Sequence, residues 1–290
     1  MSTSPDPREQ YGTHMLPGRS YEEEFVRLRL QNQLFTSGMG GLWPEQPSGA
    51  EYHRVLDVGC CSGCWLVQVA RTYPAIQHLF GVDIDSYMIA QARAFASEQG
   101  VADRVEFHAM DALRMLEFPF NYLDLVSMQL GGGNFLRTWE WPKLLQEVLR
   151  VTRPGGTLRV VESNVTQETT SPALDRLMSM IAQTMYRAGH YFSPEYTGLT
   201  DSLPRLFDQF GVQDIQTNTY TLEFHAGTVE CRDFIEYVRL SLRTVVPLVG
   251  KWGRIADDYK ELCDQAQREM EQPDFAAKLM LFVIWGSKLP

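Results

Sequence analysis

Short apolar runs alternate with amphipathic stretches over residues 53–163 of the 290-residue chain. The apolar runs read as buried strands, which we expect at 53–59, 78–84, 104–110, 122–130 and 157–163. The stretches between them read as helices, which we expect at 63–73, 85–100 and 141–152. Asp85 is placed to cap the second helix and Gly100 to end it, and Pro154-Gly155-Gly156 predicts a turn before the fifth strand.

Repeated strand–helix units with apolar strands are typical of a parallel sheet that is covered by helices on both faces. Right-handed crossovers make such a sheet doubly wound. Two further strands are expected at 212–224 and 278–287. The pattern therefore predicts an α/β fold, Rossmann-like, with a mostly parallel seven-stranded sheet.

The remaining helical patterns read as covers on this core. Residues 19–48 hold a cap helix that opens with Ser20 and Glu23, the spacing of a capping box. The acid run Glu22–Glu24 reads as a solvated first turn favoured by the helix dipole. Helical cover segments are expected at about 171–200 and 228–272, inside a single domain that spans 49–290. The polar, proline-containing residues 1–18 are expected to be disordered.

Charge and composition narrow the class of partner. Acidic residues number 36 against 26 basic residues, which argues against a nucleic-acid binder with a basic footprint. The chain's first residues lack the basic start and apolar stretch of a signal peptide, and the longest apolar run, Leu279–Trp285, is too short to span a bilayer. We expect a cytoplasmic protein with no nucleic-acid or membrane partner, and a homodimer stays open.

Three of the five cysteines lie together in "VLDVGCCSGC", residues 55–64. The odd count argues against a disulfide framework. A zinc site needs four ligands, usually in spaced pairs. Cys61 and Cys64 form one such pair and no second pair follows, so we expect no metal, with a redox role of the thiols as the other alternative.

Acidic residues end three successive predicted strands. Asp83 follows Asp57 by 26 residues, and Asp111 follows Asp83 by 28, about one strand–helix unit each. The three carboxylates should therefore meet at the ligand-binding edge of the sheet. Gly59 and Gly63 permit a tight turn and a close approach of ligand to backbone. A carboxylate at Asp83 can accept hydrogen bonds from a ribose diol.

The motifs "VLDVGCCSG", "GVDID", "AMDAL" and "LLQEVLRVTRPGGTLRVVE" together resemble the class I S-adenosylmethionine-dependent methyltransferases. The resemblance covers about residues 53–163, and the strand patterns at 212–223 and 277–286 also resemble those of the family. It narrows to the small-molecule methyltransferases that carry an N-terminal helix. It implies a class I methyltransferase domain over 49–290, with S-adenosyl-L-methionine as cofactor and S-adenosyl-L-homocysteine as product.

By this resemblance the methionine part of the cofactor meets the first strand end. Asp57 would orient the loop or reach the methionine amino group through water. The carbonyl of Met128 would face the ammonium group, and Gln33, by its helical position, would touch the carboxylate. Backbone contacts would come from Gly59, Cys61 and Gly63.

The adenosine part would meet the next two strand ends. Asp83 would hold the ribose hydroxyls while Ile84 packs on adenine, and Asp111 and Ala112 would read the adenine edge. One position departs from the family pattern, because Cys61 stands where glycine is usual. A side chain there would crowd the cofactor or require a φ angle below zero.

Candidates on the acceptor side each have a structural alternative. Glu162, at the end of the fifth strand, is a candidate to orient or deprotonate an acceptor, or else a hydrogen-bond partner within the fold. His190 and Tyr191 follow a long helix, where His190 is a candidate base or a helix-end histidine. Trp139 and Trp141 are candidates to stack on an aromatic acceptor or to belong to the core. His225 enters the pocket or lies at a strand end on the surface.

The function expected is in-line methyl transfer to a small acceptor, which needs positioning more than acid–base chemistry. The cover segments are rich in Met, Phe, Tyr and Leu, which suits an apolar or aromatic acceptor. An NAD-dependent oxidoreductase would favour Gly-x-Gly-x-x-Gly, and only Gly59 and Gly63 are present. A nucleic-acid methyltransferase resembles Asp/Asn-Pro-Pro-aromatic where this chain has Met128-Gln129-Leu130-Gly131. A non-catalytic cofactor-binding module is the third alternative, because of Cys61.

Overall fold

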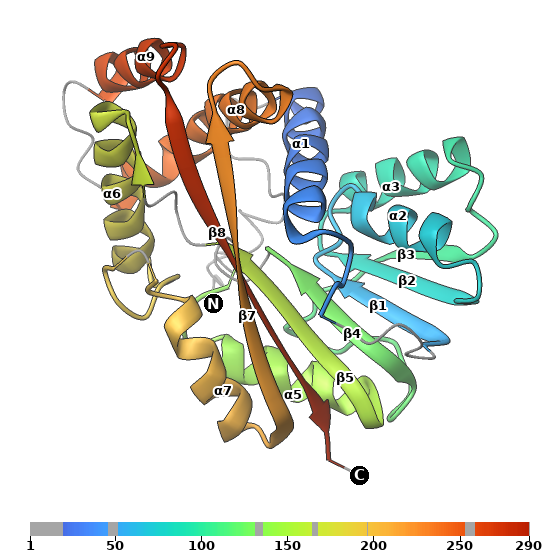
Figure 1. The fold of residues 1–290 in the computed structure, drawn as a ribbon. Helices are drawn as coiled ribbons and strands as arrows, with labels where there is room; N and C mark the ends of the chain where they lie inside the picture. The colour runs from blue at the N-terminus through green and yellow to red at the C-terminus, as the bar shows by residue number, and fades with distance from the viewer. Residues whose placement is uncertain are drawn as a thin grey trace, which may run out of the picture.

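The computed structural model confirms the predicted fold class, an α/β fold built on one sheet (Figure 1). The predicted disordered residues 1–18 and the glycine run 131–133 lie outside the described part of the chain. Side chains of 244–252 are likewise outside it, although their helical backbone is described. The structure describes residues 20–45, 52–130, 136–163, 168–195, 197–252 and 259–289.

Eight strands form the sheet in this described part. Strands β3, β2, β1, β4 and β5 are parallel in that order, and β8 runs antiparallel beside β5. β7 pairs with the other edge of β8. The seven predicted strands are all present, and the eighth, β6, has two residues, too few for a pattern. The strands are β1 Arg54–Val58, β2 His78–Asp83, β3 Val105–Ala109, β4 Leu123–Gln129, β5 Thr152–Ser163, β6 Glu168–Thr169, β7 Val212–His225 and β8 Ala276–Lys288.

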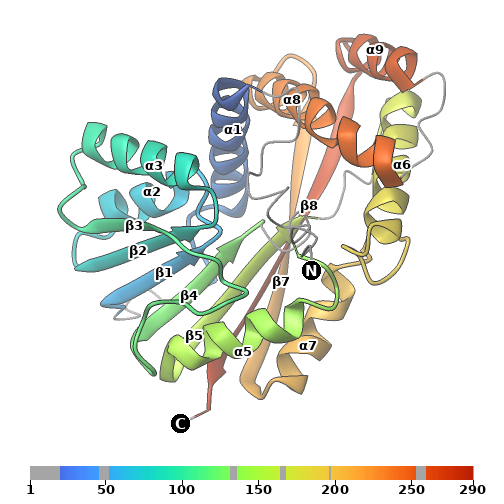
Figure 2. The ribbon, with the colours of Figure 1, turned by 180° about the vertical axis from the view of Figure 1, so that it is seen from behind.

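Helices cover both faces of the parallel strands and gather beyond their carboxyl ends. Figures 1 and 2 show α5 and α7 on one face, with α2 and α3 on the other. α1 packs on α8, and α6 packs on α8 and α9, above the sheet. None of the described helices is both long and apolar enough to cross a membrane. The helices are α1 Tyr21–Met39, α2 Cys64–Thr72, α3 Ser86–Glu98, α5 Trp141–Val151, α6 Pro172–Arg187, α7 Leu203–Gln209, α8 Val229–Trp252 and α9 Tyr259–Met270.

Side-chain caps fix the starts of three helices, as two of the sequence signals predicted. The Ser20 hydroxyl accepts a hydrogen bond from Glu23 N–H, and Asp85 accepts from Tyr87 and Met88 at the start of α3. α3 ends at Glu98, two residues before Gly100, whose φ is +68°. Ser171 caps α6 in the same way. Each cap satisfies N–H groups that the first helical turn leaves without a partner.

The predicted Pro154-Gly155-Gly156 turn forms a bulge inside a longer strand. β5 starts at Thr152, five residues earlier than expected, where Thr152 pairs with Leu123 of β4. The register then shifts, and Thr157 pairs with Leu125. Gly155 has a φ of +69°, a left-handed conformation that glycine adopts without steric cost. The prediction of a turn between α5 and β5 is therefore corrected to an irregularity within β5.

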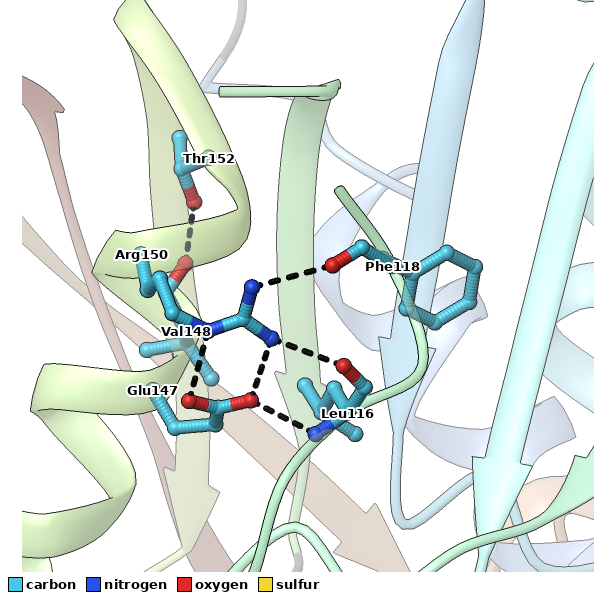
Figure 3. Close-up of polar contacts among 6 residues, drawn as sticks. All are labelled: Leu116, Phe118, Glu147, Val148, Arg150 and Thr152. Atoms are coloured by element: carbon cyan, nitrogen blue, oxygen red, sulfur yellow. Dashed lines mark hydrogen bonds and ion pairs between the residues drawn. The ribbon is translucent and has the colours of Figure 1, made fainter. Parts of the chain in front are cut away.

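An ion pair on α5 holds the segment that follows β3 (Figure 3). Arg150 and Glu147 bond side by side, with a shortest N···O distance of 2.6 Å. The Arg150 guanidinium also donates to the carbonyls of Leu116 and Phe118, and Glu147 accepts from Leu116 N–H at 2.6 Å. This network satisfies backbone groups of a segment without regular secondary structure, and so fixes the chain between β3 and β4.

Candidate active site

The glycine-rich loop, which follows β1, is hydrogen-bonded to the neighbouring strand β2. Asp57 is in register with Gly81 of β2, and Val58 with Val82. The N–H groups of Gly59 and Cys60 both donate to the Val82 carbonyl, at 2.8 and 3.0 Å. The loop therefore starts from a fixed point above β2, and its remaining residues lead into α2.

Asp83 organises this loop from the end of β2. Its carboxylate is buried, and Oδ2 accepts from the N–H of Cys61 at 2.9 Å while Oδ1 accepts from Asp85 N–H at 2.9 Å. A carboxylate is also a group that can accept hydrogen bonds from a ribose diol. The side chain predicted to hold a ribose is thus fixed in place by the loop that is predicted to hold the methionine part.

The prediction that a side chain at position 61 requires a negative φ is wrong. Cys61 has a φ of +47°, in the left-handed region that glycine usually occupies. Gly59 and Gly63 have φ angles of +72° and +71°. A Cβ atom on Gly63 would lie 2.6 Å from the Phe107 ring, so glycine is also required there by space. Cys61 keeps the backbone course of a glycine, held by its hydrogen bond to Asp83.

Burial governs the charge of the acidic and thiol groups in the loop. Burial, and next the Asp83 charge, raise the pKa of Asp57 well above its usual range. Asp57 Oδ1 is buried and has no hydrogen-bond partner among the described residues. Burial is also the main cause that raises the pKa of Cys60 and Cys61, so both thiols stay protonated at neutral pH.

No cysteine takes part in a disulfide, since all five are free thiols. Within the described ranges, no group of three or more His, Cys, Asp or Glu residues is placed to hold a metal ion. The Ser62 hydroxyl donates to Cys64 Sγ at 3.2 Å. Cys64 thereby belongs to the internal packing at the start of α2.

The positions predicted to meet adenosine lie at the ends of β2 and β3. The Met110 N–H donates to the Asp83 carbonyl at 2.9 Å, which joins the two strand ends. Ile84 leaves 39% of its surface exposed, although it is apolar. Asp111 accepts from Leu113 N–H at 2.9 Å, which fixes the turn that also contains Ala112. Their contacts with a cofactor stay predictions.

Helix α1 contributes a buried ion pair that the sequence pattern missed. Glu24 was expected in a solvated first turn, but it is 6% exposed and bonds Arg27 at 2.8 Å. Arg27 also donates to Gln31, and its charge acts on the Cys61 thiol. The i, i+3 spacing of acid and base was the available signal. The predicted carboxylate contact, Gln33, is exposed and donates to Asp233 of α8 at 3.4 Å.

Two of the acceptor-side candidates lie near each other. Glu162 is buried next to the carboxyl end of β5, and Tyr191 is buried beyond the end of α6. Burial raises the pKa of Tyr191, and the charges of Glu162 and Tyr237 add to this effect. Tyr191 therefore stays a neutral hydrogen-bond donor. Met128, whose side chain is buried, lies between Val58 and Val160 in the sheet.

His190 occupies a different environment. It is buried, and its Nδ1 donates to the Leu136 carbonyl at 2.9 Å. Burial, together with the nearby Arg137 charge, lowers the pKa of His190 to about 4. The imidazole is thus uncharged at neutral pH and bound to the backbone, and its role as a base stays a prediction.

The three candidates for acceptor contact are separated by their burial. Trp141 is fully buried at the start of α5, whereas Trp139 is 67% exposed and lies against Gly189. His225 is exposed at the end of β7, 3.7 Å from Glu223. Trp141 is therefore placed as a core residue, and His225 is placed as a surface residue.

Comparisons with known proteins agree with this geometry. A family described as "Methyltransferase domain" matches residues 55–156. The ubiquinone/menaquinone biosynthesis C-methyltransferase UbiE of Stutzerimonas stutzeri (strain A1501) is 30% identical over 62% of this chain and 71% of its own length. The demethylmenaquinone methyltransferase of Lactiplantibacillus plantarum (strain ATCC BAA-793 / NCIMB 8826 / WCFS1) is 26% identical over 69% of this chain and 90% of its own.

A solved structure shares the fold at low identity. The phosphoethanolamine N-methyltransferase 2 of Haemonchus contortus, in complex with phosphomonomethylethanolamine and S-adenosylhomocysteine, is 18% identical with a TM-score of 0.55. The match covers 93% of this chain and 58% of that one. The glycine-rich loop, the acid at the end of β2 and these matches lead to one conclusion. The chain belongs to the class I S-adenosylmethionine-dependent methyltransferases.

Proposed function

We propose that this methyltransferase moves the methyl group of S-adenosylmethionine to a small apolar or aromatic acceptor by in-line displacement. The observation that carries the proposal is the Asp83 carboxylate, which is fixed to the Cys61 N–H at the mouth of the glycine-rich loop. It places a charged acceptor of hydrogen bonds where a ribose diol and a methionine tail can be held together.

The residues at the site fit such a cofactor. Asp57 has a buried oxygen with no partner among the described residues, which is an acceptor suited to an ammonium group. A Cβ atom built on Gly59 would have no neighbour within 4 Å, so a ligand can approach the loop backbone there. Asp83 would hold the ribose hydroxyls, and the exposed Ile84 side chain would pack on adenine. Asp111 and Ala112 would lie at the adenine edge.

When bound, the cofactor supplies a methyl group on a sulfonium, which is already a good leaving group. The protein's part is then to hold the attacking atom in line and to exclude water. Glu162 would accept a proton or a hydrogen bond from the acceptor, and Tyr191 would donate one. A base is required only where the acceptor must lose a proton.

The surroundings of the site support an apolar or aromatic acceptor. Phe35 of α1 and Tyr237 of α8 meet edge to face, with ring centroids 5.7 Å apart. Phe35, Tyr191 and the Met128 and Leu130 side chains at the end of β4 belong to the same buried apolar cluster. The name of one relative refers to ubiquinone and menaquinone biosynthesis and that of another to demethylmenaquinone, which adds quinone-like rings to the acceptors to be tested.

The test is methyl transfer from labelled S-adenosylmethionine to three substrate sets: phenols and quinols, aliphatic alcohols and amines, and RNA or DNA. Labelled product is expected from the first set and none from nucleic acid. Asp83→Ala should abolish turnover and binding of S-adenosylhomocysteine. Asp103→Asn, a change at an exposed acid before β3, is the matched control and should leave both intact.

Other outcomes would overturn the proposal. Heat of binding with NAD and none with S-adenosylmethionine would favour an oxidoreductase. Tight binding of S-adenosylmethionine without turnover on any set would favour a non-catalytic module. Product from RNA or DNA alone would favour a nucleic-acid enzyme. The cytoplasmic location stays a prediction that cell fractionation can check, and light scattering can decide the open question of a homodimer.

A further inference from the structure

A row of polar side chains crosses the middle of the sheet beneath the glycine-rich loop. Asp57 of β1 is in register with Ser127 of β4, which is in register with Arg159 of β5. Residues in register on neighbouring strands point to the same face of a sheet. Asp57 is 2% exposed, and Ser127 and Arg159 are fully buried. An acid, a hydroxyl and a guanidinium thus share one buried face of the sheet.

Two described residues between α1 and β1, Glu45 and Tyr52, contact β5 beside this row. Trp43 stacks on Tyr73 with centroids 4.6 Å apart, and meets the rings of Trp65 and Tyr52 edge to face. This aromatic anchor brings the Glu45 carboxylate over β5, where Glu45 Oε1 accepts from Arg159 Nε. Tyr52 also reaches β5 directly, with its hydroxyl 3.2 Å from Thr157 Oγ1.

The pairing of Glu45 with Arg159 leaves several buried atoms unsatisfied. Glu45 Oε2, both terminal nitrogens of Arg159 and Asp57 Oδ1 have no hydrogen-bond partner among the described residues. A buried polar atom that stays unpaired destabilises the fold. Pairs of arginine and carboxylate are frequently bidentate, whereas this pair uses one oxygen and Nε only. Buried water is the usual partner for such groups, and it would connect the row.

We propose that Arg159 is a positioning residue for cofactor binding, which acts through the charge of the Asp57 carboxylate, and that Glu45 limits how much of the Arg159 charge reaches Asp57. The inference rests on the proposed contact between Asp57 and the cofactor's ammonium group. The charged groups that act on Asp57 are Asp83 from β2 and Arg159 from β5, of opposite sign. The Cys60 thiol beside them is protonated.

The consequence is a link between cofactor binding and proton release. Burial and the Asp83 charge raise the pKa of Asp57, and Arg159 opposes them. An ammonium group binds the ionised carboxylate, so Asp57 must lose its proton as the cofactor binds. Affinity should therefore increase with pH until Asp57 is ionised in the free protein.

Two substitutions at one ion pair then act in opposite directions. Arg159→Met removes the positive charge, raises the pKa of Asp57 and weakens binding at neutral pH. Glu45→Gln removes the negative charge that offsets Arg159, lowers the pKa of Asp57 and strengthens binding at acid pH. Below the pKa, affinity changes about tenfold for each unit by which it moves. A structural ion pair would instead give losses of the same sign from both changes.

The experiment is calorimetric titration of the full chain with S-adenosylhomocysteine from pH 5.5 to 7, where the ligand's amino group stays protonated, in two buffers of different ionisation enthalpy. Arg159→Met should shift the affinity profile to higher pH and Glu45→Gln to lower pH. Asp57→Asn should remove both the pH dependence and the proton release. Arg153→Met, which breaks the pair with Asp124 at the other end of β5, is the matched control and should leave the profile unchanged.

Losses of the same size from Arg159→Met and Glu45→Gln at every pH would overturn the inference, as would proton release that persists in Asp57→Asn. Circular dichroism checks that each variant folds. If Arg159→Met does not fold, the opposite shift in Glu45→Gln and the flat profile of Asp57→Asn still decide the question. Absence of S-adenosylhomocysteine binding by the unmodified protein would refute the proposed function instead.

Discussion

Asp83 and Cys61 are joined by a hydrogen bond of 2.9 Å from the backbone N–H of Cys61 to Asp83 Oδ2. The acid lies at the end of β2 and the cysteine lies in the loop after β1, so the bond connects two neighbouring strand ends. The bond also holds the left-handed backbone at Cys61 in place. The side chain proposed to hold the ribose is therefore part of the architecture of the loop as well.

Asp83→Asn should weaken both stability and cofactor binding. Asparagine keeps one oxygen, so either the Cys61 or the Asp85 N–H loses its acceptor in a buried site. The expected loss in the free energy of unfolding is about 1–3 kcal/mol. Urea denaturation measures this loss, and titration with S-adenosylhomocysteine should show an affinity lower by at least about tenfold. Unchanged affinity would contradict the proposed role of Asp83.

Cys61→Gly should stabilise the protein. A left-handed conformation costs a non-glycine residue about 1–2 kcal/mol, and the greater freedom of glycine in the unfolded chain offsets part of this. We expect a gain of about 0.5–1 kcal/mol in the free energy of unfolding. Cys61→Val should be less stable than the unmodified protein, because β-branched residues tolerate positive φ poorly. Thermal unfolding compares the three, and a glycine variant that melts lower would refute the account.

Glu147→Gln should destabilise the protein without changing cofactor affinity. The variant leaves Arg150 without its charged partner and weakens the bond to Leu116 N–H, at a cost of about 1–3 kcal/mol. The hydrogen bond from Arg150 is the main cause that lowers the pKa of Glu147. The contribution of Glu147 to the free energy of unfolding is therefore complete above its unfolded pKa of about 4.3. This contribution is lost as the pH falls below that value.

Urea denaturation at pH 7 and pH 4 measures this contribution. The unmodified protein should lose more of its unfolding free energy between these pH values than Glu147→Gln does. Glu117→Gln, at an exposed neighbouring position, is the control and should behave like the unmodified protein. An equal pH dependence in all three would show that the Glu147–Arg150 pair does not contribute.

His190 should make the protein sensitive to mild acid. Its folded pKa of about 4 lies below the unfolded value of about 6.5. Protonation therefore favours the unfolded chain, and stability is lost as the pH falls from about 6.5 toward 4, by at most about 1.4 kcal/mol per pH unit. His190→Gln should flatten this part of the stability curve measured by urea denaturation. A variant that keeps the full slope would place the acid sensitivity elsewhere.

The fold was predictable because its signals are local. Each strand of the parallel core is a short apolar run, and helix caps such as Ser20 and Asp85 are read from single positions. The acids at 57 and 83 could be placed at one edge from their spacing, since each strand–helix unit returns the chain to that edge. The order of the family motifs along the chain then indicated which strand end would meet which part of the cofactor.

The parts that escaped prediction depend on distant contacts. Glu24 looks like a surface acid, and only the packing of α1 against α8 and the glycine-rich loop buries it. Glu45 and Arg159 are 114 residues apart and meet because the Trp43 anchor folds one segment over the sheet. A sequence pattern does not record which face such a segment will cover.

The two-stranded ribbon of β7 and β8 extends beyond the parallel strands and determines where α8 and α9 lie. β5 pairs with β8 only over Leu281–Ser287, whereas β7 follows β8 as far as Ala276. The far end of the ribbon carries α8 and α9 in the connection between its two strands (Figure 1). Because a strand advances about 3.3 Å per residue, the length of the β7–β8 ribbon sets how far α8 and α9 lie beyond the end of β5. We expect related enzymes with shorter or longer ribbons to hold the corresponding helices nearer to the sheet or farther from it.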